Sequence, residues 1–318
     1  AAAEAAAAVA LLLTLVRRLS LRRWQRRRYD DAVEGLLRAA LWLRPGGGVQ
    51  QISEVLPLGA FGVEVRGLDL SSPGLPADRL RRLLWEQGLL VFRGQDLLEE
   101  DVLRVADIFA EPVPAEGQAE ALAIYRVRDR DPAPRGQDFW HSDNSYTPEP
   151  GGPTLLYALR IPHGPEGPLG DTLFADAGVP LSGALRKRAQ GRLGRHNLAH
   201  NAGIPLPEDG SGTWTRPQDA LHDVIKLHPL TGQEVVFVNE SYVSCIEGLD
   251  KEQSDNLLAD LQDHVLQRVY RHRWQADDLL VWDNYRLQHK ATTLSLPPGA
   301  ERVMWRVQTL GPGKPAKK

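Results

Sequence analysis

His141, Ser142 and Asp143 are the first residues whose types and spacing could do chemistry. On an extended segment, side chains two positions apart project to the same side, so the imidazole and the carboxylate would lie together. One imidazole and one carboxylate supply two of the three ligands of a 2-His-1-carboxylate facial triad, which holds non-haem iron. The alternative is a hydrogen-bonded His–Asp pair at the surface.

A third ligand could come from the segment 279–289. Leu279 to Trp282 is a short apolar run typical of a buried strand, and Asp283-Asn284 begins a polar turn that leads to His289. Jelly rolls bring distant strands together, so this histidine could reach the first pair. The alternative is a histidine that caps a turn.

Two arginines lie four positions apart near the C-terminus. Arg302, Met304 and Arg306 alternate on one face of an expected strand, opposite Val303 and Trp305. Arginines inside a barrel are costly unless they meet anions. A guanidinium binds carboxylates and sulfonates through a two-pronged donor geometry. The alternative is an exposed polar face with the apolar residues inward.

The elements that must position these residues are many short strands separated by Pro/Gly-rich turns. We expect helices over 77–87, 99–109, 181–190 and 251–266. We expect strands within 55–65 (two, with a turn at 59–62) and at 89–92, 154–159, 172–175, 235–238, 267–272, 279–282 and 303–309, and a loop over 115–138. This pattern predicts a mainly β fold with helices, an α+β chain with a double-stranded β-helix (jelly roll) core and helical insertions.

Several motifs occur in one order along the chain: Trp140-His141-Ser142-Asp143, then Trp282-Asp283-Asn284 with His289, then 302–306. With these motifs the chain resembles the taurine/2,4-dichlorophenoxyacetate (TauD/TfdA) dioxygenases over about residues 55–312. Further matching stretches are 58–60 through 67–70, 90–95, 170–176 and 270–274.

The resemblance implies a Fe(II)- and 2-oxoglutarate-dependent dioxygenase. It implies that His141, Asp143 and His289 bind Fe(II), while Thr172 and Arg302 hold the distal carboxylate of 2-oxoglutarate. With O2 as the other cosubstrate, such an enzyme hydroxylates a small organic substrate and releases succinate and CO2.

The substrate is the least determined part. Arg306 occupies the position that contacts the substrate's acidic group in relatives, or assists cosubstrate binding, and Gln137 and Asn144 are further candidates for substrate contact. Tyr285 stands where relatives usually carry Arg, and Ala110 replaces a usual Gly. These departures leave the substrate as a small acid of sulfonate, carboxylate or phenoxyacid type, without a name.

Composition excludes some functions. The chain has 38 basic and 41 acidic side chains, for a net charge of −3. Because phosphate binding needs a basic face, nucleic acid is not expected as a partner. Cys245 is the only cysteine, which excludes an intramolecular disulfide and a thiolate metal cluster.

Residues 1–48 form an expected separate extension before the dioxygenase domain at 49–318. The run 1–16 is almost wholly apolar, and seven arginines follow it up to Arg28. It could be a membrane anchor, an organellar targeting segment, a peripheral helix, or an alanine-rich helix packed on the domain. We expect an intracellular location, cytoplasmic or organellar, with membrane contact through 1–28 as an open alternative.

Two other classes of function stay open at the level of sequence. One is a jelly-roll protein that binds a metal or a small acid without turnover. The other is a membrane-tethered scaffold whose N-terminal segment carries the function. A homo-oligomer, dimer or tetramer, is also expected from the resemblance.

Overall fold

Two β-sheets carry the fold in the computed structural model, which describes residues 48–113, 124–130, 138–200 and 218–315. In the large sheet the strand order is β1-β2-β3-β16-β6-β18-β4, and β5 also pairs with β18. The small sheet has the order β15-β9-β17. The large sheet consists of β1 (Glu54–Pro57), β2 (Val63–Arg66), β3 (Leu89–Phe92), β4 (Pro112–Val113), β5 (Ile124–Arg130), β6 (Thr154–Arg160), β16 (Leu279–Trp282) and β18 (Glu301–Thr309). The small sheet consists of β9 (Thr172–Asp176), β15 (Val269–His272) and β17 (Leu287–Ala291).

The central strand β16 is buried on both faces. Leu279 and Val281 belong to the apolar cluster that contains the helices α3 (Ala77–Gln87) and α4 (Glu99–Phe109). Leu280 and Trp282 point the other way, into a cluster shared with the small sheet. Side chains alternate along a strand, so a continuous apolar run is what a strand covered on both sides requires.

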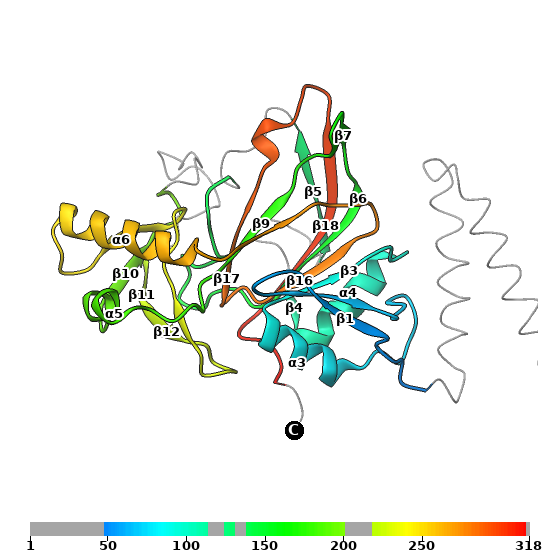
Figure 1. Ribbon diagram of the computed structural model, residues 1–318, viewed down its shortest axis with the longest axis horizontal. Helices are drawn as coiled ribbons and strands as arrows, with labels where there is room; N and C mark the ends of the chain where they lie inside the picture. The colour runs from blue at the N-terminus through cyan, green and yellow to red at the C-terminus, as the bar shows by residue number, and fades with distance from the viewer. Residues whose placement is uncertain (1–47, 114–123, 131–137, 201–217, 316–318) are drawn as a thin grey trace, which may run out of the picture. The chain divides into compact units, whose positions relative to one another are not determined.

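The helices α3 and α4 lie together beside β1 and β3, where Figure 1 draws them in cyan. Each has an apolar side, and Leu80, Leu84 and Phe109 are fully buried. α3 ends at Gly88, which adopts a left-handed conformation (φ 78°) and donates its N–H to Leu84 O. Glycine takes this conformation without steric cost, and the chain can therefore turn directly into β3.

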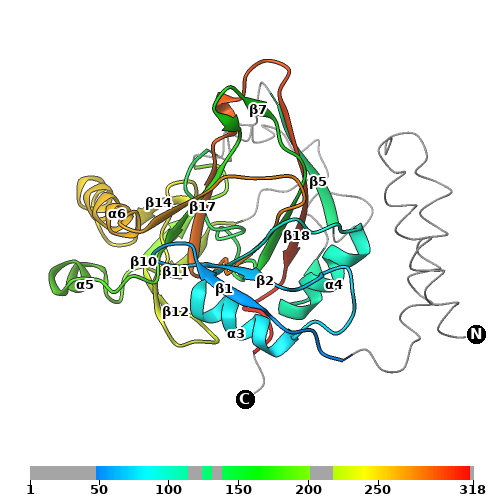
Figure 2. The same cartoon turned by 45° about the vertical axis from the view of Figure 1, so that its right-hand side comes forward.

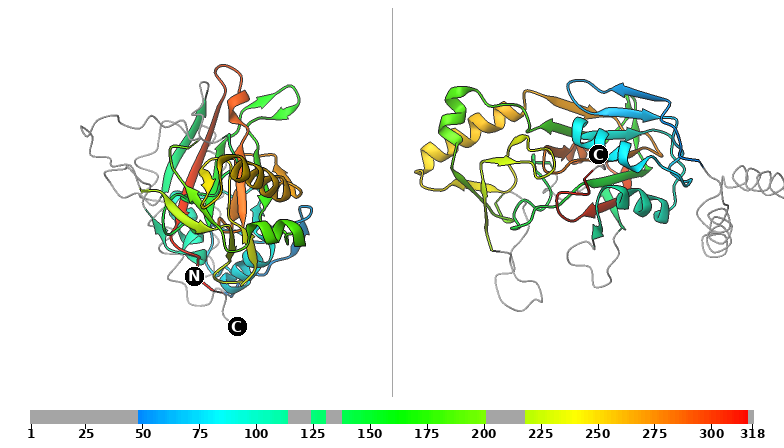
Figure 3. Two further views of the ribbon diagram at one scale, coloured as in Figure 1. Left: turned by 90° about the vertical axis from the view of Figure 1, so that its left-hand side faces the viewer. Right: turned by 90° about the horizontal axis from the view of Figure 1, so that it is seen from below.

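An insertion at the other end of the domain holds a second group of elements. Figure 3 shows α5 and α6 together, away from β1 and β2. Its apolar core is a separate cluster around Val236, Leu257 and Leu261. The group consists of α5 (Gly183–Ala189), α6 (Lys251–Val265), the three-stranded sheet β11-β10-β14 and the hairpin β12-β13, with β10 at Leu193–His196, β11 at Ala220–Asp223, β12 at Ile225–Leu227, β13 at Glu234–Val236 and β14 at Val243–Ile246.

The expected jelly-roll core with helical insertions is confirmed, and α3, β3 and α4 have the predicted bounds. Two details of the prediction were wrong. Part of the expected loop 115–138 is the strand β5, which Figure 2 shows beside β18. His289 lies within β17 rather than at the end of a turn. Among the described strand pairs, β2 and β3 are parallel and the others are antiparallel.

The N-terminal extension lies outside the described residues, so its separate role stays a prediction. Within the part of the chain that is described, no helix is both long and apolar enough to cross a membrane. Short elements complete the chain: β7 (His163–Gly164), β8 (Gly167–Pro168) and the 3-10 helix η2 (Thr293–Ser295).

Candidate metal centre and cosubstrate site

The backbone brings His141 and His289 together. His141 N donates to His289 O at 3.0 Å, and His289 N donates to His141 O at 2.8 Å, as in a short antiparallel bridge. Their ring centroids are 4.2 Å apart. Main-chain hydrogen bonds therefore bring two histidines from distant parts of the sequence side by side.

Asp143 completes a group of three. Its Oδ1 lies 3.8 Å from His141 Nε2 and 3.7 Å from His289 Nε2. One ligand atom from each of the three residues falls within 4.8 Å of the others, and all three side chains are buried. We expected His141 and Asp143 to project to the same side of an extended segment. The structure instead places Asp143 in a turn that follows the bridge.

The turn that carries Asp143 is held by Asn284. Asn284 Oδ1 accepts from Asp143 N at 2.8 Å, and Asn284 Nδ2 donates to Asp143 O and to Gly151 O, each at 2.9 Å. Asn284 is fully buried. Asn284 belongs to the Trp-Asp-Asn motif, but no role was predicted for it. Its place in the turn just before β17 was the signal that it could support the site.

Electrostatics favour the protonation states that a divalent metal needs. Burial lowers the pKa of both His141 and His289, which keeps the imidazoles neutral. Burial by itself would raise the pKa of Asp143, but Arg306 and the two histidines lower it below its usual range. Neutral imidazoles beside an ionised carboxylate are the donor set that a hard or borderline divalent cation binds.

One imidazole has its tautomer fixed. His141 Nδ1 lies 2.9 Å from Phe139 O, and a carbonyl only accepts, so Nδ1 carries the hydrogen. The lone pair of Nε2 then points toward Asp143. A hydrogen bond of this kind commonly orients metal-binding histidines. His289 Nδ1 has no hydrogen-bond partner among the described residues. The three residues fit a metal ion in donor type, burial and charge.

Arg302 and Thr172 also lie together, on β18 and β9. Arg302 Nη1 donates to Gly170 O at 2.8 Å and to Thr172 Oγ1 at 3.3 Å. Trp274 Nε1 donates to the same Oγ1 at 3.0 Å. The threonine oxygen thus accepts from two donors, which leaves its own hydroxyl hydrogen for an acceptor such as a carboxylate.

A carboxylate that the sequence analysis missed holds Arg302. Asp129 on β5 lies directly across from Arg302 in the strand register, and its Oδ2 accepts from Nε at 2.8 Å and lies 2.7 Å from Nη2. Both residues are 2% exposed. The arginines at 126, 128 and 130 alternate with the residues between them, which was an available signal for a strand but did not show that Asp129 faces Arg302.

Arg306 lies two strand repeats further along β18. Its Nη2 forms an ion pair with Asp143 Oδ1, and its Cζ is 6.0 Å from the ring centre of Tyr125. The buried Nε has no hydrogen-bond partner among the described residues. Arg302 and Arg306 both face the interior, so the alternative of an exposed polar face is wrong.

The remaining substrate candidates are less well placed. Asn144 adopts a left-handed conformation (φ 55°), and its Oδ1 accepts from Tyr146 at 3.2 Å. This is a local contact, and a role in substrate binding stays a prediction. Gln137 lies outside the described residues.

Three histidines of the insertion are buried. His196, His222 and His228 are at most 6% exposed. His196 Nδ1 lies 3.1 Å from Ser145 Oγ, and His222 Nε2 lies 2.9 Å from Thr147 O. These contacts tie the insertion to the turn after Asp143, which an analysis of separate motifs could not show.

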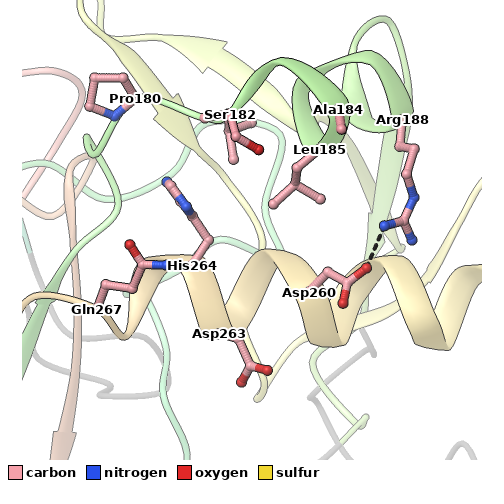
Figure 4. Close-up of a pocket in the computed structure, with 10 residues that line it drawn as sticks. Pro180, Ser182, Ala184, Leu185, Arg188, Asp260, Asp263, His264 and Gln267 are labelled. Atoms are coloured by element: carbon pink, nitrogen blue, oxygen red, sulfur yellow. Dashed lines mark hydrogen bonds and ion pairs between the residues drawn. The ribbon is translucent and has the colours of Figure 1, made fainter.

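A groove between α5 and α6 lies apart from these residues. Figure 4 shows His264 and Gln267 on one side and Leu185 on the other, with an ion pair between Arg188 and Asp260. None of the triad residues lines it. The groove is therefore a feature of the insertion and not an opening to the metal centre.

Comparisons with known proteins agree with this geometry. The profile described as "Taurine catabolism dioxygenase TauD, TfdA family" matches residues 54–308. An alpha-ketoglutarate-dependent dioxygenase of Penicillium expansum, cnsP, is 32% identical over 274 residues, which cover 78% of this chain and 72% of that protein. The alpha-ketoglutarate-dependent 2,4-dichlorophenoxyacetate dioxygenase of Cupriavidus pinatubonensis is 29% identical over 283 residues, covering 80% and 95%.

A solved structure of a taurine dioxygenase has a similar fold. The crystal structure of a taurine dioxygenase from Burkholderia xenovorans superposes with a TM-score of 0.67 at 26% identity, and the match covers 81% of this chain and 90% of that one. A jelly roll with two histidines and one aspartate in its interior defines a metal- and 2-oxoglutarate-dependent dioxygenase. The chain belongs to the TauD/TfdA family.

Proposed function

We propose that the protein uses Fe(II), 2-oxoglutarate and O2 to hydroxylate a small organic acid. The observation that carries the proposal is the group His141, Asp143 and His289, with its ligand atoms within 4.8 Å of one another. These three residues would hold the metal. When bound, iron and 2-oxoglutarate supply the oxidation of a C–H bond, coupled to release of succinate and CO2.

The chain's own residues bind and orient the two organic partners. Thr172, with a hydroxyl hydrogen left to donate, and Arg302 would take the distal carboxylate of 2-oxoglutarate. Arg306, whose Nε has no partner among the described residues, would take the acid group of the substrate. Both arginines are largely buried, which strengthens a charge-assisted hydrogen bond because water does not compete for it.

The substrate class follows from Arg306 and from the names of the relatives. One relative is named for 2,4-dichlorophenoxyacetate and another for taurine, and each of these compounds carries an acid group. Tyr125 beside the guanidinium and Tyr242, whose ring lies edge-on to His141 at 6.1 Å, add flat apolar surface near the metal residues. These contacts support small sulfonates, carboxylates and phenoxyacids as the compounds to screen.

An anaerobic titration with Fe(II) and 2-oxoglutarate tests the proposal. We expect a weak charge-transfer band in the visible range, because both keto-acid oxygens would reach the metal. The band should be lost in His141→Ala and kept in His163→Ala, a change at an exposed histidine. Metal binding without the band would overturn the cosubstrate assignment. Oxygen consumption with the panel of acids would then identify the substrate.

A further inference from the structure

The two carboxylate oxygens of Asp143 have different surroundings. Oδ1 faces both imidazoles and Arg306. Oδ2 accepts a hydrogen bond from Thr154 Oγ1 at 3.1 Å. Thr154 is only 1% exposed, so water does not compete strongly for this bond. The carboxylate therefore has one oxygen directed at the histidines and one occupied by a neutral donor.

Thr154 is held rigidly. It begins β6, a strand with partners on both sides, and lies across from Trp282 on β16 and from Gln308 on β18. A threonine side chain also has few rotamers, because it branches at Cβ. Its hydroxyl is consequently fixed relative to the large sheet, whereas Asp143 lies in a turn outside that sheet.

The main chain of Asp143 is fixed by other bonds. Asn284 holds Asp143 N and O and also Gly151 O. Those bonds leave the rotation of the carboxylate about its own side-chain torsions undetermined. The contact with Thr154 is the hydrogen bond that acts on Oδ2, so the two contacts have separate tasks.

We propose that Thr154 is a positioning residue that orients the Asp143 carboxylate, so that Oδ1 alone is presented to the metal. This inference rests on the proposed metal site. A carboxylate can bind a cation through one or both oxygens. An occupied Oδ2 favours the one-oxygen mode, which leaves room at the metal for the cosubstrate. Hydrogen bonds to metal-binding carboxylates often change metal affinity by roughly 10- to 100-fold.

Thr154→Val tests the inference, since it removes the hydroxyl and keeps the shape. The matched control is Thr309→Val. Thr309 is also 1% exposed and donates its hydroxyl to Pro153 O at 2.7 Å rather than to a metal ligand. Thr154→Ser keeps a hydroxyl and should therefore keep the wild-type metal binding. The probe is Co(II), which reports its coordination by its visible spectrum and does not need turnover.

We expect Thr154→Val to weaken Co(II) binding about tenfold, at the low end for such contacts, and to change the Co(II) spectrum. Thr309→Val should lower the thermal midpoint about as much as Thr154→Val does. It should keep the wild-type Co(II) affinity and spectrum. Thr154→Ser should resemble the wild type in both. If Thr154→Val does not fold, Thr154→Ala carries the same expectations.

Three results would overturn the inference. Thr154→Val or Thr154→Ala could bind Co(II) with wild-type affinity and spectrum. Thr309→Val could change affinity and spectrum as much as Thr154→Val, which would show a general structural effect. The wild type could bind no Co(II), a failure of the proposed metal site itself, and this result is distinguished because it precedes any substitution.

Discussion

The strand β18 places two arginines beside carboxylates, Arg302 at its first end and Arg306 further along toward its second end, and the two pairs differ. At the first end, Arg302 uses its donors on the protein itself: Asp129, Gly170 O and Thr172 Oγ1 are all within 3.3 Å. This guanidinium is part of the framework that joins β18, β5 and β9. A ligand carboxylate there would meet a cation that is already oriented.

At the second end, Arg306 has fewer contacts with the protein. It pairs with Asp143, which belongs to the candidate metal centre, and its Nε has no partner among the described residues. Asp143 is the side chain that pairs with it by charge, and Tyr125 lies beside it. Arg302 is therefore part of the framework and, under the proposed function, would also hold the cosubstrate. Arg306 would suit a partner that varies.

The largest expected effect is on stability at the first end. Arg302→Met would leave Asp129 buried without its partner, which costs about 3–5 kcal/mol of unfolding free energy. Arg306→Met should cost about 1–3 kcal/mol, because Asp143 keeps the hydrogen bond from Thr154. Denaturant unfolding of the metal-free proteins measures both. A larger loss of unfolding free energy in Arg306→Met than in Arg302→Met would contradict the difference between the two arginines.

A double change is the control for that experiment. Arg302→Met with Asp129→Leu replaces the whole buried pair by apolar side chains, and such replacements are often neutral or stabilising. We expect the double variant to recover most of the lost stability and to remain unable to bind 2-oxoglutarate. Recovery of 2-oxoglutarate binding would show that Arg302 does not hold the cosubstrate.

A smaller effect is expected at the second end, on substrate affinity. Arg306→Lys keeps the charge but loses the two-pronged donor, so the KM for the best acid of the panel should rise about tenfold. The KM for 2-oxoglutarate should change much less. Steady-state kinetics with each substrate varied in turn separates the two. Equal changes in both constants would place Arg306 at the cosubstrate instead.

The last effect lies outside the two arginine sites and concerns the insertion that supports the turn after Asp143. Burial lowers the pKa of His196 to about 3. Below pH 6.5 the unfolded chain takes up a proton that the folded chain does not, so stability falls as the pH falls. Between pH 7 and pH 5 this residue should account for about 2 kcal/mol of that loss. In His196→Phe the loss should be smaller by that amount. Denaturant unfolding at both pH values measures this loss for each protein. If the wild type and His196→Phe lose the same unfolding free energy between pH 7 and pH 5, the prediction is contradicted.

The sequence predicted those parts of the molecule whose signals are local. Leu279 to Trp282 is apolar without interruption, and α3 ends at a glycine, so their bounds were found. The candidate triad was found because its residues lie in short motifs that can be recognised one at a time in the sequence. The strand β5 was missed although the arginines at 126, 128 and 130 alternate along it, because this short pattern lies in a stretch rich in charges, proline and glycine, and its pairing with β18 could not be seen in the sequence.

Contacts between distant segments could not be predicted where no motif marks them. Asp129 faces Arg302 only because β5 and β18 pair in one register, and a one-residue shift would turn it to the other face. His196 and His222 are buried because the small insertion sheet packs against the turn after Asp143. A single histidine in a polar stretch gives no sign of such packing.

The main-chain bridge between His141 and His289 has a consequence for how such proteins diversify. The close approach of the two residues depends on peptide groups, which every residue type except proline supplies in full. Side chains around the site can therefore be exchanged over evolutionary time while that spacing persists. One scaffold can thereby serve different acids, as the different compounds in the names of the relatives suggest.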